Sequence, residues 1–417
     1  MRVLTVKPFL IRAIATLAGF AIMAPVGAQT INAPILVPLH LTLIDTGTYK
    51  LGIYATIGHG AAPALFEFDT GATGFYATYS PNQNVSPWWG SGVNSLHRPV
   101  DASYASGLHY TGNLVEAPVT LYGSSDPSSA LVAFRATARI GQMDSIVDEK
   151  NGNAPIWDAN GSVSGNPPVN GAFYGDFGMG LIFNSNGITN LLARLVYGPR
   201  VVAGFRIHVD PVGQNASVRI GLTRNDVWNP YAFYFSMNVD PKARGALSPG
   251  SGTQYFSQQV FNATINITDR KSLKSRNVGM ITDTGATTEL HNTQESRGAL
   301  PNKYDALINW DNQQIDAGEL KSGLNFALSG RPIWGKHVSF FSFETTSVFN
   351  AGRVGVSNDG GDYFLNTGIS FFYPYDVIYN LRDGTIGLVP DSRSGNFASR
   401  SPKKNDEKPN HREKERK

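Results

Sequence analysis

The sequence predicts a mostly β protein made of two related lobes, and three observations lead to that prediction. The 417 residues are 41% hydrophobic and 16% charged, a balance typical of a soluble globular chain with a large core. Gly (44) and Pro (24) separate short runs rich in Thr, Val, Ile, Tyr and Phe, and long helical periodicities are scarce. The segment Asp-Thr-Gly-Ala-Thr occurs once in each half after an apolar strand, as a duplicated fold with a pseudo-twofold axis would leave it.

The N-terminus has the pattern of a secretory signal peptide. Three basic residues precede and border an apolar run at 13–24, and small residues follow at 26–28. We therefore predict that residues 1–28 are removed on export and that the mature protein is periplasmic or secreted. The apolar run is too short for a membrane span and no second one follows, so no stable membrane anchor is expected.

The chain has no cysteine, which excludes disulfides, thiolate metal sites and a cysteine nucleophile. It also has no zinc-type His-Glu-x-x-His segment, and we expect neither a metal nor another cofactor. The tail, residues 393–417, is expected to be a solvated, disordered extension, and the formal charge of +3 is concentrated in its part from Ser399 onward. Because no aromatic residue interleaves these charges, a nucleic-acid partner is not expected.

Strand-like runs continue along the mature chain, separated by loops rich in Gly, Ser, Asn and Pro. The segments expected as strands are Ile35–Thr42, Tyr49–Ile57, Leu65–Phe68, Val115–Tyr122, Ala130–Ile140, Val202–Val209, Ala216–Leu222, Phe233–Val239 and Phe256–Ile267. Helical signal is weak, and Ile188–Val196 is its best short case. Two segments, Pro81–Asn94 and Met143–Val169, are expected as long irregular loops.

Turn residues cluster around Thr223–Ala232, and a new set of strands follows them. We place the boundary between the two lobes there. The first lobe is expected to span residues 29–225 and the second residues 226–392.

Each copy of the repeated segment places an aspartate at the end of an apolar strand: FEFDTGATGFY holds Asp69 and GMITDTGATTEL holds Asp283. A single copy would be read as a turn, but two copies in matching places favour a pair of facing carboxylates. Such a pair cannot readily ionise twice, so it shares one proton. It can then hold a water molecule, with the ionised group taking its proton and the protonated group donating to the oxyanion that develops.

The residues that follow each aspartate suit this arrangement. Gly71 and Gly285 supply amides that can approach a carboxylate without a side chain in the way, and a buried carboxylate needs such donors. Thr70 and Thr284 have hydroxyls that can tie one loop to the other. We therefore expect these four residues to support the pair.

The two segments resemble, in order, the two active-site segments of the pepsin-like aspartic proteases. FYGDFGMGL at Phe173–Leu181 and the stretch Leu365–Pro390 are similar to further conserved segments of that family. The resemblance implies two β-barrel-like lobes related by a pseudo-twofold axis, with an active-site cleft between them. It also implies an endopeptidase that holds a protein or peptide substrate in the cleft and cleaves it with Asp69 and Asp283. We expect the protein to be a monomer.

The segment SYASGLHYTG, at Ser103–Gly112, resembles the hairpin flap of this family. The resemblance implies that Tyr104 closes over substrate and that Gly107 lets the hairpin tip bend. Tyr76 stands seven residues after Asp69, where the family usually has a Trp that helps hold the flap. The alternative is a plain hairpin, in which Tyr-x-x-Gly is common.

Two departures from the family pattern bear on activity. Ala72 and Ala286 stand where Ser or Thr usually gives each carboxylate an outer hydrogen bond, and fewer bonds to the ionised form raise a carboxyl pKa. We therefore expect activity at less acidic pH than that of typical pepsins. Asn366-Thr367-Gly368 replaces two apolar residues before Gly, so the support behind Asp283 is expected to be weaker or differently bonded.

Three other readings compete with the protease. A catalytically weak or inactive pepsin-like protein could bind peptides or act as an inhibitor, but relatives of that kind commonly lack one Asp, and both are present here. A sugar-binding β-sandwich could stack ligands on Trp88 and Trp89 if their loop exposed them, but it leaves the repeat unexplained. A Ser-His-Asp hydrolase is disfavoured because none of the eight histidines lies in a recognisable catalytic segment.

Overall fold

The computed structural model describes most of the chain between residues 30 and 391. The described residues are 30–44, 48–126, 134–160, 167–243, 253–257, 261–268, 273–291, 315–316, 319–346, 352–357 and 364–391. The predictions for the signal peptide and for the C-terminal tail fall outside them. Within these ranges, no helix has both the length and the apolar character that a membrane crossing requires.

Strands dominate the described residues, which confirms the mostly β prediction. In chain order the strands are β1 (Thr30–Ile31), β2 (Ile35–Leu43), β3 (Tyr49–Ile57), β4 (Ala64–Asp69), β5 (Thr73–Thr78), β6 (Asn94–Ser103), β7 (Leu108–Tyr122), β8 (Phe134–Asp148), β9 (Ala154–Asp158), β10 (Gly175–Met179), β11 (Val196–Tyr197), β12 (Val202–Asp210), β13 (Asn215–Leu222), β14 (Phe233–Ser236), β15 (Phe261–Thr268), β16 (Leu273–Ile281), β17 (Glu289–His291), β18 (Ile315–Asp316), β19 (Glu319–Leu320), β20 (Asn325–Gly330), β21 (Val338–Glu344), β22 (Gly355–Ser357), β23 (Phe364–Asn366), β24 (Tyr375–Asn380) and β25 (Thr385–Pro390). The helical segments are the α-helix α1 (Arg224–Val227) and the 3₁₀ turns η1 (Glu149–Asn151), η2 (Leu191–Arg194), η3 (Pro241–Ala243) and η4 (Ile369–Phe372).

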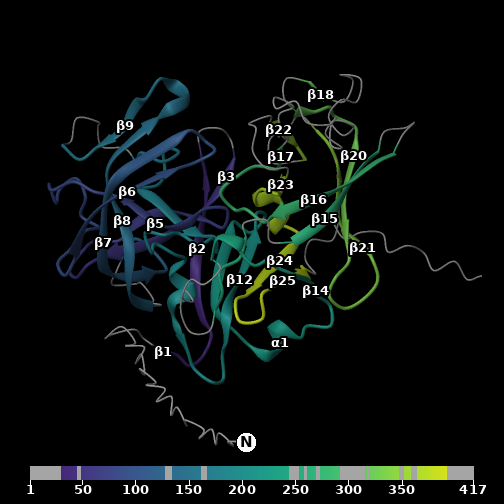
Figure 1. Ribbon diagram of the computed structural model, residues 1–417, viewed down its shortest axis with the longest axis horizontal. Helices are drawn as coiled ribbons and strands as arrows, with labels where there is room; N and C mark the ends of the chain where they lie inside the picture. Colours follow the sequence, from purple (N-terminus) through teal and green to yellow (C-terminus); the bar gives the residue numbers. More distant parts are fainter. Residues whose placement is uncertain are drawn as a thin grey trace, which may run out of the picture.

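The larger sheet connects distant parts of the chain. Its order is β14-β25-β24-β12-β13-β2-β3-β4-β10-β5-β8-β7-β6, with β9 added beside β8. Because β7 pairs with β3 as well as with β8, the strands between them curl round into a closed circuit of pairings, seen on the left of Figure 1. At the opposite end, β24 and β25 bring the last described strands of the chain against β12 from its middle.

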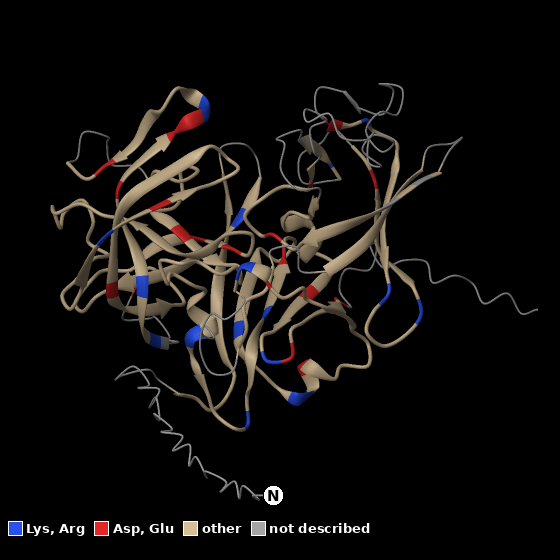
Figure 2. Cartoon of the chain, viewed as in Figure 1, with Lys and Arg blue, Asp and Glu red and all other residues tan. Residues whose placement is uncertain are grey.

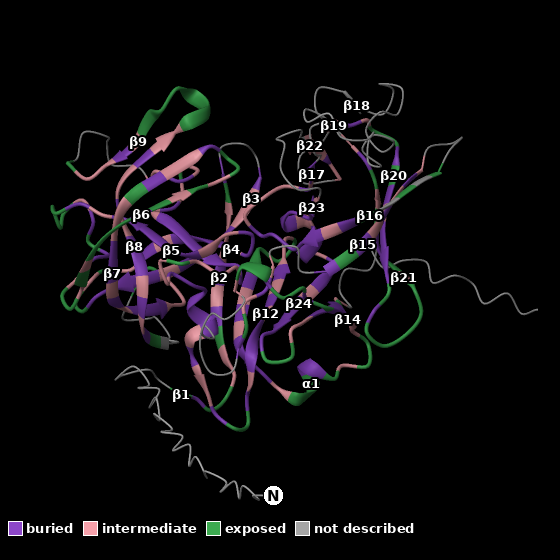
Figure 3. Ribbon diagram, in the orientation of Figure 1, coloured by how far each residue is buried: buried purple, intermediate pink, exposed green. Residues whose placement is uncertain are grey.

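The second sheet has the order β18-β19-β22-β17-β23-β16-β15-β20-β21 and lies on the right of Figure 1. Figure 3 shows buried residues along the strands of both sheets. One continuous hydrophobic cluster runs through them, from Phe66 and Phe68 in β4 to Phe261 in β15 and Phe371 in η4. Figure 2 shows residues of both charge signs on the strands of the larger sheet, and Asp and Glu on strands of the second sheet.

The two halves of the chain repeat one local arrangement of three strands. In the first half, β10 lies parallel to β4 and antiparallel to β5. In the second half, β23 lies parallel to β16 and antiparallel to β17. Each repeated Asp-Thr-Gly segment is therefore held in the same strand environment, although more than 200 residues separate the two copies.

Most expected strands are present, and β3 has the expected bounds. The loop expected at Met143–Val169 is wrong over much of its length, because β8 continues to Asp148 and β9 follows it. This polar stretch becomes strand because β8 pairs with β7 on one side and β9 on the other, and cross-strand pairing overrides a weak local propensity. The helix expected at Ile188–Val196 shrinks to the single turn η2.

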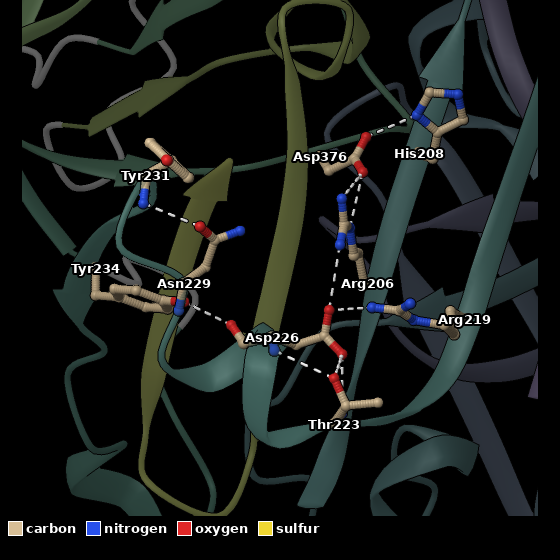
Figure 4. Close-up of polar contacts among 9 residues, drawn as sticks. All are labelled: Arg206, His208, Arg219, Thr223, Asp226, Asn229, Tyr231, Tyr234 and Asp376. Atoms are coloured by element: carbon tan, nitrogen blue, oxygen red, sulfur yellow. Dashed lines mark hydrogen bonds and ion pairs between the residues drawn. The ribbon is translucent and has the colours of Figure 1, made fainter. Parts of the chain in front are cut away.

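A cluster of ion pairs fastens β12, β13, β24 and α1 together (Figure 4). The guanidinium of Arg206 contacts both Asp376 and Asp226, and Arg219 also contacts Asp226. His208 Nδ1 lies 2.6 Å from Asp376 Oδ1. Burial alone would raise the pKa of Asp376, but the hydrogen bond with His208 and the charge of Arg206 outweigh it and hold that pKa below its usual value.

Candidate active site

Asp69 and Asp283 lie against each other and line one cavity of about 870 Å³. Each carboxylate sits directly over the glycine of the opposite segment. A Cβ atom added to Gly71 would overlap the carboxylate of Asp283, and one added to Gly285 would overlap that of Asp69. Only glycine therefore permits this close reciprocal approach.

Backbone amides hold both carboxylates in place. Gly71 N–H donates to Asp69 Oδ1 at 2.6 Å, and Ala72 N–H donates to the same oxygen at 3.2 Å. Gly285 N–H donates to Asp283 Oδ1 at 2.7 Å. The two segments thus use the same turn to supply the donors that a buried carboxylate requires.

Thr70 and Thr284 bind each other's loops reciprocally. Thr70 N–H donates to Thr284 Oγ1 at 3.1 Å, and Thr284 N–H donates to Thr70 Oγ1 at 3.0 Å. Each hydroxyl also donates at 2.7 Å across the pair, from Thr70 to the carbonyl of Thr282 and from Thr284 to that of Phe68. Both threonines are buried, so these bonds fix the position of one aspartate relative to the other.

This network can be measured by a double-mutant cycle. We expect Thr70→Val and Thr284→Val each to lower the free energy of unfolding by about 1–3 kcal/mol, because each leaves buried partners unpaired. The double variant should lose less than the sum of the two, since both changes break the same bonds. Urea unfolding measures the free energy of unfolding of the two single variants and the double variant. Thr264→Val on β15, which removes an exposed bond to Asn277 on β16, is the control and should change stability by about 0.5 kcal/mol or less. Additive losses for the pair would contradict the shared network.

Asn366 is a site residue whose contact the sequence left open. Its Nδ2 donates to Asp283 Oδ2, and its Oδ1 accepts from Gly368 N–H at 3.0 Å. The outer donor that Ala286 cannot give is thus supplied from β23. The support behind Asp283 was expected to be either weaker or differently bonded, and the structure shows that it is differently bonded.

The pKa of Asp69 is raised well above its usual value. Burial is the main cause, followed by the negative charges of Asp283, Asp176 and Glu67. The sequence attributed a raised pKa in the pair to missing hydrogen bonds. The structure gives the same direction for Asp69, but from burial and a surrounding group of carboxylates.

Lys50, Glu67 and Asn170 form a polar group beside the pair that the sequence analysis missed. The ammonium of Lys50 contacts Glu67 Oε1, and Asn170 Nδ2 donates to Glu67 Oε2 at 2.9 Å. Glu67 lies two residues before Asp69 on β4, so both side chains point to the same face of the sheet. That alternation was visible in the sequence; the pairing of β3 with β4 and the turn that holds Asn170, which bring these two residues to Glu67, were not.

The expected flap is a hairpin between β6 and β7 that borders the cavity. Tyr104 N–H donates to the carbonyl of Leu108 at 3.0 Å, and Gly107 N–H donates to the carbonyl of Tyr104 at 2.9 Å. Gly107 has φ +98°, a backbone conformation that favours glycine at this tip. Tyr104 lines the cavity and packs against Tyr110, with ring centroids 4.8 Å apart.

Tyr76 also lines the cavity. Its hydroxyl accepts a hydrogen bond from Asn184 Nδ2 at 3.2 Å. By contrast, the exposed loop tryptophans that a sugar-binding module would need are absent at Trp88 and Trp89. Both are 2% exposed, and both indole N–H groups donate to the carbonyl of Thr78, which makes them part of the core.

Comparison of the sequence with known proteins does not assign this site to a family. A scan of the chain against protein-family models gives no match, and its sequence matches no curated protein. Among the described residues, no group of three or more His, Asp or Glu side chains is arranged to hold a metal ion.

Proposed function

We propose that the chain is an exported, pepsin-like aspartic endopeptidase that hydrolyses peptide bonds with a water molecule activated by Asp69 and Asp283. The observation that carries this proposal is the reciprocal placement of the two carboxylates, each over the glycine of the opposite Asp-Thr-Gly segment. The bonds between Thr70 and Thr284 make the arrangement rigid. Pre-organised groups of this kind lower an activation barrier without moving during the reaction.

The repeated three-strand arrangement supports a two-lobed fold with the pair between the lobes. The flap hairpin and both aspartates border the same cavity, which has room for several residues of an extended peptide. An extended substrate can use main-chain hydrogen bonds for affinity and side-chain pockets for preference.

The donors around the pair suggest which carboxyl holds the shared proton. Asp283 receives bonds on both oxygens, from Gly285 and Asn366. Asp69 receives backbone bonds on Oδ1, and its pKa is raised. In this mechanism Asp283 takes a proton from water as the water attacks the peptide carbonyl, and Asp69 donates its proton to the oxyanion that develops.

Cleavage of an unfolded protein mixture from strongly acidic to neutral pH tests the proposal, with new termini identified by mass spectrometry and with and without pepstatin. Internal cleavage is expected, and inhibition by pepstatin would show how closely the cleft follows pepsin's. A folded protein that cuts nothing at any pH would overturn the enzyme proposal. A catalytically inactive pepsin-like peptide-binding protein would then be the better one, and the bond from Asn366 to Asp283, which occupies an oxygen of the pair, is the observation that favours it.

The pH dependence of cleavage follows from the raised pKa of Asp69. Activity needs one proton on the pair and is lost as pH rises through the higher of its two apparent pKa values. Because that value is raised, we expect kcat/KM to persist into weakly acidic solution. A profile confined to strongly acidic pH would contradict this expectation.

A further inference from the structure

Asp176 places a third carboxyl group on the face of the sheet that bears the pair. In the parallel pairing of β10 with β4, Asp176 is opposite Glu67 and Gly178 is opposite Asp69. Side chains two residues apart on a strand share a face, so Asp176 points the same way as Glu67 and Asp69. It lies about 7 Å along the strand from the level of Asp69, given a rise of about 3.3 Å per residue.

The carboxyl of Asp176 is buried, and within the described part of the chain no donor reaches it with normal hydrogen-bond geometry. The residue is 3% exposed and lines the cavity, yet no residue that the structure describes donates to either of its oxygens. The hydroxyl of Tyr104, which is close enough to affect its pKa, forms no hydrogen bond of normal geometry with any described residue either. Buried carboxylates are ordinarily paired, so this exception needs an explanation.

The nearby cations are already engaged. Lys50 contacts Glu67, and the ammonium of Lys150, which also borders the cavity, donates to the carbonyl of Ala105 at 2.5 Å. Carboxyl groups outnumber these two lysines in the cavity wall. The carboxyl groups in the cavity wall are those of Glu67, Asp69, Asp101, Asp176, Asp283 and Glu289. A cavity with this excess of negative charge attracts a cationic ligand.

Asp176 has a counterpart in the other half of the chain, Asn366, which makes different hydrogen bonds. Asn366 is paired with Ile281 on β16 as Asp176 is paired with Glu67 on β4. The side chain of Asn366 is hydrogen-bonded to Asp283, whereas Asp176 forms no hydrogen bond with Asp69. The first half therefore keeps a carboxyl available to the cavity where the second half has a supporting amide.

We propose that Asp176 forms a subsite for the guanidinium of an arginine side chain in a peptide substrate, next to the bond that is cleaved. Its two unpaired oxygens match the two parallel N–H donors of a guanidinium. The distance of about 7 Å from the level of Asp69 is within reach of an arginine whose backbone lies at the pair. The position relative to a cleaved bond rests on the proposed endopeptidase function; the binding of the cation does not.

The electrostatics of the site agree with this assignment. Burial, and then the charge of Glu67, raise the pKa of Asp176 well above its usual value, and Tyr104 and Lys50 offset this only in part. A bound guanidinium would supply the opposite charge that the carboxyl lacks in the protein alone. Lysine would satisfy the charge but only one of the two oxygens at a time.

Matched peptides test the subsite. A peptide series carries arginine at successive positions, and each peptide has a twin with citrulline, a neutral isostere, at the same position. For one position next to the cleaved bond, we expect wild-type kcat/KM to be about 10- to 100-fold higher for arginine. Asp176→Asn should reduce the ratio of kcat/KM between the arginine peptide and its citrulline twin to about threefold or less. Asp101→Asn, which removes an exposed carboxylate from the wall of the same cavity, should change the preference by less than about threefold.

Calorimetric binding of the same twins to Asp69→Asn, with and without Asp176→Asn, separates the subsite from the enzyme. If arginine peptides bind more tightly through Asp176 but nothing is cleaved, the subsite stands and the endopeptidase proposal falls. If wild type cleaves both twins equally at every position, the subsite is overturned and the endopeptidase remains. Equal loss on both twins in Asp176→Asn would show a structural role only and would also overturn the subsite.

Discussion

Asp69→Asn and Asp283→Asn are each expected to lower kcat/KM for peptide cleavage by about a thousandfold or more. Either change leaves the pair unable to hold one ionised and one protonated carboxyl, and positioned acid–base groups commonly contribute 10²- to 10⁴-fold. The double variant should be little worse than either single one, because the two groups act as a unit. The measurement is the initial rate of cleavage of one peptide substrate under single-turnover and steady-state conditions.

The fold should survive these substitutions, which makes the result interpretable. Asparagine has nearly the shape of aspartate, and losing a buried negative charge removes repulsion from the group that holds Glu67 and Asp176. Unfolding by urea should therefore show equal or greater stability at neutral pH. Glu344→Gln, an exposed change on β21, is the charge control and should keep wild-type activity. Retention of more than about a tenth of the activity in either aspartate variant would exclude the pair as the catalytic machinery.

Gly71→Ala and Gly285→Ala are expected to reduce kcat/KM by about a hundredfold or more without touching a titratable group. Each added methyl would overlap the opposite carboxylate, so the two loops must separate or the carboxylates must rotate. A displacement of about 1 Å of reacting groups can cost about 10²-fold in rate. Overpacking should also lower the free energy of unfolding by about 1–3 kcal/mol.

Gly355→Ala is a matched control for this pair of changes. Gly355 lies in β22 without a positive φ, and a Cβ added there would have its nearest neighbour, Glu289 Cγ, at an ordinary 3.5 Å. The Gly355→Ala variant should keep kcat/KM within about twofold of wild type. Wild-type rates in both Gly71→Ala and Gly285→Ala would mean that the carboxylates do not work in the close arrangement seen here.

The strand framework and the positions of Asp69 and Asp283 could be predicted because both follow from local sequence patterns. The period-two alternation of FEFD and the turn chemistry of Asp-Thr-Gly identify β4 and place Asp69 at its end. The repeat of that segment predicted the meeting of Asp69 with Asp283, which the structure brings about. The glycine at the hairpin tip, Gly107, was expected from the resemblance of Ser103–Gly112 to the flap of the pepsin-like proteases.

The remaining site residues depend on strand order, which local patterns do not specify. β10 inserts between β4 and β5 after about a hundred intervening residues, and only that register puts Asp176 opposite Glu67. The bond from Asn366 to Asp283 depends in the same way on the placement of β23 beside β16. Lys50 reads in the sequence as an ordinary surface lysine of β3, although its ammonium is largely buried against Glu67. The extension of β8 arises from its two partners rather than from its own composition.

The pairing of β24 with β12 has a consequence for when the protein can first act. β12 precedes the second aspartate by more than seventy residues, but its outer edge is covered only by a strand near the end of the described chain. A polypeptide still emerging from a ribosome or threading through a translocation channel can contain both aspartates and yet lack the strand that completes this sheet. Latency during biosynthesis would then come from the order of synthesis, with chemistry delayed until the last strands are in place.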